Sequence, residues 1–89
     1  MEQLEFDFYE IGDLRIKLFC FFVESFQRNQ NEINIVIYRY SDRLVMKCFK
    51  ENKINEKVIT YKILNSFKLS FIDYYVEILI DEVISKFNE

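Results

Sequence analysis

The sequence contains no histidine, proline, tryptophan or alanine, and a single glycine, Gly12. Without histidine the chain lacks the commonest general base near neutral pH, together with Ser-His and Cys-His nucleophiles. One glycine cannot build a Walker A or dinucleotide-binding loop, because both need several glycines at fixed spacing. We therefore expect no histidine-dependent chemistry and no nucleotide hydrolysis by the usual routes.

Cysteine is scarce as well. Cys20 and Cys48 are the two cysteines, and they form no CxxC pair. A zinc site would need carboxylates to complete an unusual ligand set, so we expect no metal and no cofactor. Both cysteines lie in apolar runs, which favours two free thiols packed as small hydrophobic side chains in a reducing cytosol. A disulfide between them is the less favoured alternative.

Long apolar runs and excess positive charge are also missing. No apolar stretch approaches the length of about 18 residues that a membrane span requires, and the acidic, alternating residues 1–10 do not resemble a signal peptide. We expect a cytoplasmic protein with no membrane partner. The net charge of −3 gives no overall field that would attract nucleic acid.

Large aromatic side chains are what the sequence has in excess. The chain has 89 residues, 51% of them hydrophobic, with ten Phe and six Tyr. This length fits one domain, residues 1–89, whose interior is too small for so many rings, so we expect some of them at a contact surface. The many Ile, Asn, Lys, Phe and Tyr residues have A/T-rich codons and indicate an AT-rich genome, bacterial, phage or otherwise viral.

Two polar clusters, residues 27–32 and 51–57, divide the chain into three parts. In the first part, apolar and polar residues alternate over residues 4–9, which predicts a strand with one buried face. Residues 13–28 fit both a strand and a helical stripe. We favour a helix capped by Asp13, with an ion pair between Glu24 and Arg28, and keep the strand as the alternative.

The middle part, residues 32–50, has the pattern of a β-hairpin that turns at Ser41-Asp42. That turn lacks the Gly or Asn of a primed turn, so a longer loop with the same strand faces is the alternative. One face of the hairpin is entirely apolar and is expected to face the core: Ile33, Ile35, Ile37, Leu44, Met46 and Cys48. The opposite face carries a mixed set: Val36, Tyr38, Tyr40, Arg43, Val45, Lys47 and Phe49.

The last part predicts a strand over residues 58–64, with Ile59, Tyr61 and Ile63 on one side, and an amphipathic helix over 70–88. Ser70 and Asp73 have the spacing of a capping box. The helical stripe consists of Ile72, Val76, Leu79, Ile80, Val83 and Phe87. The expected fold is α+β: a small antiparallel sheet of three to five strands around the hairpin, packed on this helix and on the helix 13–28.

Two groups of residues are candidate partner-binding sites. The mixed hairpin face combines aromatic and basic side chains, as protein interfaces do; it could instead be covered by the first helix or by a second copy, or it could stack unpaired bases. The alternative site is an acidic ridge on the last helix, Asp73, Glu77 and Asp81. That ridge fits a solvated outer face, with Glu82 paired to Lys86, or a docking strip for a basic partner.

No motif specific to a protein family is present. In size and composition the chain is similar to small phage-encoded inhibitors of host or defence proteins, such as anti-CRISPR proteins, although no residue motif carries the similarity. We expect a non-enzymatic module that binds a larger host or defence protein and that self-associates. The alternatives are binding of single-stranded nucleic acid or a nucleotide through the aromatic face, and an enzyme that uses carboxylates alone.

Overall fold

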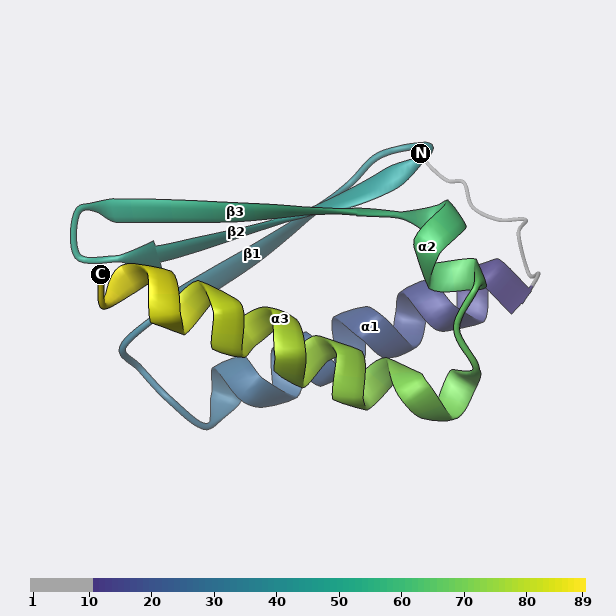
Figure 1. The fold of residues 1–89 in the computed structure, drawn as a ribbon, viewed down its shortest axis with the longest axis horizontal. Helices are drawn as coiled ribbons and strands as arrows, with labels where there is room; N and C mark the ends of the chain where they lie inside the picture. The colour runs from purple at the N-terminus through teal and green to yellow at the C-terminus, as the bar shows by residue number, and fades with distance from the viewer. Residues whose placement is uncertain (1–10) are drawn as a thin grey trace.

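The computed structural model describes residues 11–89, which form one three-stranded antiparallel sheet with helices on one side of it (Figure 1). The sheet order is β1-β2-β3, so each strand pairs with the next one along the chain. The predicted α+β class is confirmed. The strand predicted for residues 4–9 lies outside the described residues. The elements are α1 (Ile11–Arg28), β1 (Asn34–Arg39), β2 (Arg43–Lys50), β3 (Lys53–Thr60), α2 (Tyr61–Asn65), the short 3₁₀ helix η2 (Leu69–Phe71) and α3 (Ile72–Phe87).

The segment 13–28, which was ambiguous in sequence, is part of helix α1, and the strand alternative is wrong. Residues 11 and 12 are already helical, so Asp13 lies inside the helix and is not its N-cap. The predicted i,i+4 ion pair is present, with Arg28 Nη2 3.9 Å from Glu24 Oε1. Both side chains are largely exposed, so the pair contributes little to stability.

The central hairpin forms in the predicted register. Tyr38 lies opposite Val45, and the Tyr40 N–H donates to the Arg43 carbonyl across the turn at 2.9 Å. The turn at residues 41–42 therefore has the predicted length. Within the described chain its backbone has no positive φ, so it is not a primed turn. The predicted core face is confirmed, with buried or half-buried side chains at Ile33, Ile35, Ile37, Leu44, Met46 and Cys48.

The strand predicted for residues 58–64 is wrong in both of its bounds, because β3 runs from Lys53 to Thr60. It ends there because the Thr60 hydroxyl accepts a hydrogen bond from the Ile63 N–H at 3.2 Å and caps the short helix α2. Tyr61 and Ile63 consequently lie on α2 and do not share a strand face.

The polar cluster 51–57 is mostly strand, because only residues 51–52 form the turn between β2 and β3. One of its lysines lies on the inner side of the sheet, where Lys57 Nζ is 2.6 Å from Glu82 Oε1 on α3. The predicted pair of Glu82 with Lys86 is therefore replaced by a tertiary contact between strand and helix.

Helix α3 has the predicted apolar stripe but not the predicted cap. Ser70 lies inside η2, which precedes the helix, and the N-cap position belongs to Phe71, which makes no side-chain cap bond. The capping box is thus wrong, and the chain enters α3 directly from a tighter 3₁₀ turn. The six residues of the stripe are buried: Ile72, Val76, Leu79, Ile80, Val83 and Phe87.

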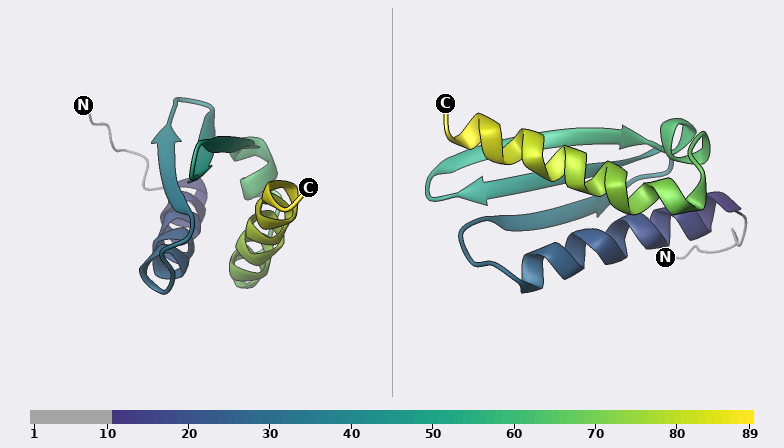
Figure 2. Two further views of the ribbon diagram at one scale, coloured as in Figure 1. Left: turned by 90° about the vertical axis from the view of Figure 1, so that its left-hand side faces the viewer. Right: turned by 60° about the horizontal axis from the view of Figure 1, so that its bottom comes forward.

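Both long helices cover the same face of the sheet, α1 beneath β1 and α3 beneath β3 (Figures 1 and 2). The core fills the space between the sheet and this helix layer. Helix α1 therefore does not cross to the other face of the hairpin, and no element within residues 11–89 covers that face. None of the helices in this range has the length and apolar character needed to cross a bilayer.

Candidate functional site

The candidate site is the sheet surface that points away from the helices, here called the outer sheet face. Residues directly opposite each other in neighbouring antiparallel strands share a face, so the register gives its composition directly. Four rows of three residues cross the sheet: Asn34, Phe49 and Ile54; Val36, Lys47 and Glu56; Tyr38, Val45 and Val58; and Tyr40, Arg43 and Thr60.

Large apolar side chains on this face are open to solvent. Their exposed fractions are 41% for Val36, 42% for Tyr38, 48% for Tyr40, 62% for Ile54 and 54% for Val58. They come from adjacent rows and from two edge strands, so they form a contiguous patch and are not isolated surface residues. An exposed patch of this kind is typical of an interaction surface.

Two apolar residues form the floor of the patch. Val45 is only 8% exposed and Phe49 is half-buried, although no helix lies above them. Both belong to the central strand β2, where side chains of β1 and β3 flank them on each side. Val45 therefore supports the contact surface more than it contributes exposed area to it.

One basic side chain lies beside Tyr40 at the turn end of the face. The Arg43 guanidinium carbon is 4.6 Å from the centre of the Tyr40 ring, a cation–π distance. Arg43 Nη1 is also 2.8 Å from Asp42 Oδ1. The guanidinium is thus oriented by a ring on one side and a carboxylate on the other.

A second basic side chain, two rows further along the face, also lies near a tyrosine ring and a carboxylate. Lys47 Nζ is 5.6 Å from the centre of the Tyr38 ring and 3.9 Å from Glu56 Oε1 on β3. Each cation of the face therefore has its own carboxylate, and the four charged groups sum to zero. The outer sheet face is an apolar and aromatic surface with balanced charge.

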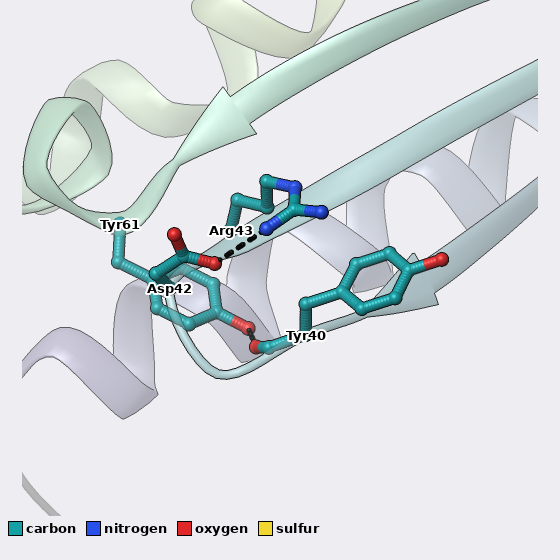
Figure 3. Close-up of polar contacts among 4 residues, drawn as sticks. All are labelled: Tyr40, Asp42, Arg43 and Tyr61. Atoms are coloured by element: carbon teal, nitrogen blue, oxygen red, sulfur yellow. Dashed lines mark hydrogen bonds and ion pairs between the residues drawn. The ribbon is translucent and has the colours of Figure 1, made fainter.

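The turn that carries Tyr40 is held in place by the start of α2 (Figure 3). The Tyr61 hydroxyl donates to the Tyr40 carbonyl, and the Tyr61 N–H donates to the Asp42 carbonyl at 3.1 Å. These bonds satisfy two turn carbonyls from outside the hairpin. A turn with no glycine is stabilised in this way, and the Tyr40–Arg43 pair gains a fixed position.

All seven residues predicted as the primary site lie on this one face, and the structure adds β3 to it. Sequence reasoning missed Ile54, because it took residues 51–57 as a polar cluster between elements. It placed Val58 in a strand over residues 58–64 but did not assign that strand to this face. The signal was present: Ile54, Glu56 and Val58 recur at period two, as strand residues do.

The alternative site lies elsewhere in the molecule. Asp73, Glu77 and Asp81 are exposed on α3, in the helix layer on the opposite side of the sheet. They line a shallow groove between α1 and α3 together with Phe22 and Phe26. The two predicted sites are therefore separate surfaces.

The thiols are packed and free. Cys48 is fully buried on the inner face of β2, and burial raises the pKa of its thiol to about 11. Burial also raises the pKa of the half-buried Cys20 thiol, although the neighbouring Arg39 partly offsets that rise. A thiol with a raised pKa is a poor nucleophile and a poor metal ligand near neutral pH. Among residues 11–89 no three His, Cys, Asp or Glu side chains gather as metal ligands.

No protein family model, curated protein or solved structure matches this chain.

Proposed function

We propose that the protein is a non-enzymatic binding module whose outer sheet face contacts a larger protein. The observation that carries this proposal is an apolar patch that no element of residues 11–89 covers, on a sheet whose described helices lie on the other side. Aromatic side chains next to arginine are the residues that contribute most to binding free energy at protein interfaces. A rigid sheet presents them at little cost in conformational entropy.

The charge arrangement supports a protein partner over single-stranded nucleic acid. A surface for nucleic acid needs cations that are available to phosphates and ring faces that are available to bases. Here Arg43 and Lys47 each have a carboxylate within 4.0 Å, and each lies over a tyrosine ring. Binding of single-stranded nucleic acid or a nucleotide is the second candidate, favoured only by the two tyrosines.

We further propose that the partner is a host or defence protein in the cytoplasm and that the module is encoded by a phage or another mobile element. The AT-rich composition and the two free thiols support this assignment. The same face could also join two copies of the chain, since an apolar patch of this kind supports self-association.

The test is affinity capture from a lysate of a candidate host, followed by measured affinity for the captured protein. We compare the parent with the Tyr38→Ala, Phe49→Ala double variant. Tyr74→Ala is the matched control, because Tyr74 is an exposed aromatic residue on α3. The double variant should lose at least about 2 kcal/mol of binding free energy, roughly 30-fold in Kd, whereas the control should bind as the parent does.

A salt titration separates the two candidate partners. Binding to a protein should change little with salt, whereas binding to a single-stranded oligonucleotide should weaken steeply, because phosphate contacts release counterions. Tight, salt-sensitive oligonucleotide binding that the double variant loses would show that the protein-binding proposal is wrong. Light scattering of parent and double variant at several concentrations reports self-association through the same face.

A further inference from the structure

A groove lies between α1 and α3. Both helices lie on the side of the sheet opposite to the outer sheet face (Figure 2). Its volume is about 220 Å³. The apolar lining comes from both helices: Phe22 and Phe26 of α1, and Val76 and Ile80 of α3. The two phenylalanines are only half-buried, so the groove already exposes aromatic surface to solvent.

One wall of the groove is acidic along its whole length. Asp73, Glu77 and Asp81 follow one another at intervals of four residues on α3, and all three side chains are exposed. Carboxylates at this spacing repel one another. None of the groove-lining residues within 11–89 is basic.

These carboxylates are unpaired within the described part of the chain. Other acidic side chains of the molecule have cations, such as Glu56 with Lys47 and Glu82 with Lys57. No ion pair or side-chain hydrogen bond with another residue in the range 11–89 involves the three groove carboxylates. The groove therefore combines an apolar floor with negative charge that nothing nearby compensates.

We propose that this groove binds a basic amphipathic helix of another protein. An apolar groove between two helices accepts the i, i+3, i+4, i+7 stripe of a third helix, and lysines or arginines flanking that stripe would meet the acidic wall. The wall runs from Asp73 to Asp81 of α3, eight helical steps of about 1.5 Å each, so its ends lie roughly 12 Å or two helical turns apart.

A helix from a second copy of this chain would fit the groove poorly. Its long helices carry few basic residues, and one of them, Arg15, is already bonded to the Phe67 carbonyl at 2.6 Å. A second copy would also bring its own acidic wall to the contact. A partner of opposite charge fits better, and it can bind while the outer sheet face holds another protein.

The test uses two synthetic 18-residue helical peptides with the same leucine stripe, one flanked by lysine and the other by glutamate. Fluorescence anisotropy measures affinity, and amide chemical-shift changes locate the bound peptide. The lysine peptide should bind at least tenfold more tightly than the glutamate peptide. Its largest shifts should fall on residues 22–26 of α1 and residues 73–81 of α3.

Matched variants distinguish the groove from overall charge. The double variant Glu77→Lys, Asp81→Lys should bind the lysine peptide with at least tenfold lower affinity than the parent does. Glu32→Lys with Glu89→Lys changes net charge equally at exposed positions outside the groove and should weaken this binding much less. The double variant Tyr38→Ala, Phe49→Ala should bind the lysine peptide as tightly as the parent does. The groove proposal and the proposal for the outer sheet face can therefore fail independently of each other.

Three results would overturn the proposal. The two charge-reversal variants could lose the same affinity for the lysine peptide, the parent could bind the two peptides with equal affinity, or the amide chemical-shift changes could fall on the outer sheet face. A parent dimer that dissociates on Glu77→Lys with Asp81→Lys would make a second copy the occupant and would likewise overturn it. Circular dichroism melting confirms that the variants are folded.

Discussion

At the scale of single residues, Glu51 has an unfavourable backbone conformation. Its φ is 57°, in the left-handed region that suits glycine and asparagine. The residue lies in the two-residue turn between β2 and β3, where the strands leave no room for a longer loop. Glu51→Asn should raise the free energy of unfolding by up to about 1 kcal/mol, because asparagine tolerates this conformation better. Urea denaturation measures the change, and a clear loss of stability would contradict it.

The Cys48 thiol gives the protein a pH dependence at high pH. Burial raises its pKa from 9.0 to about 11, so above pH 9 the folded state retains a proton that the unfolded state loses. Stability should therefore fall as pH rises from 9 to 11, by about 2–3 kcal/mol at about 1.4 kcal/mol per pKa unit.

Cys48→Ala is the control for this effect. Tyr75, whose pKa is also raised by burial, remains in both proteins and contributes equally to each. The difference in urea midpoint between the parent and Cys48→Ala should be smaller at pH 11 than at pH 8.5. Parallel pH profiles would show that Cys48 does not cause the loss of stability.

At the scale of elements, the inner stripe of α3 provides much of the core. Leu79 is 7% exposed and packs on the sheet. Leu79→Asp should unfold the protein, because an unpaired carboxylate would enter an apolar interior. Tyr74→Asp on the exposed side of the same helix should retain cooperative melting. If Leu79→Asp melted like the Tyr74→Asp control by circular dichroism, the assignment of this stripe to the core would be wrong.

Sequence patterns predicted the elements that have one apolar face and missed those that do not. The hairpin register and the α3 stripe followed from clear periodicity. Residues 13–28 were ambiguous because α1 is apolar on several sides: Phe19 faces the core, Phe22 lines the groove and Phe21 is exposed. When apolar residues surround a helix, the period of 3.6 that distinguishes it from a strand is lost.

Residues 53–57 of strand β3 were missed for the opposite reason. Its inner positions near the turn are polar, because they bond to the polar end of α3 and do not enter the core. Lys57 pairs with Glu82, and Lys53 Nζ donates to the Phe87 carbonyl at 3.4 Å, where a helix C-terminus attracts a cation. Such tertiary partners leave no pattern in the local sequence, so the inner face of β3 could not be recognised as a strand face. The third of the outer sheet face that β3 supplies was therefore left out, although its outer residues recur at period two.

At the scale of the whole molecule, the protein consists of two layers with a different open surface on each side. The sheet presents apolar and aromatic side chains with balanced charge, and the helix layer presents an apolar groove with a negative wall. A single helix layer covers only one face of a three-stranded sheet. The aromatic excess of the sequence is therefore divided between the core and these two surfaces.

The central claim is that the outer sheet face is open surface and not part of the core. The free energy of unfolding of Tyr38→Ala with Phe49→Ala, measured by urea denaturation of dilute protein, tests it most directly. We expect a value within about 1–2 kcal/mol of the parent, the scale of changes outside a core. A loss of about 3–5 kcal/mol for each aromatic residue would show that the face is interior and would contradict the account.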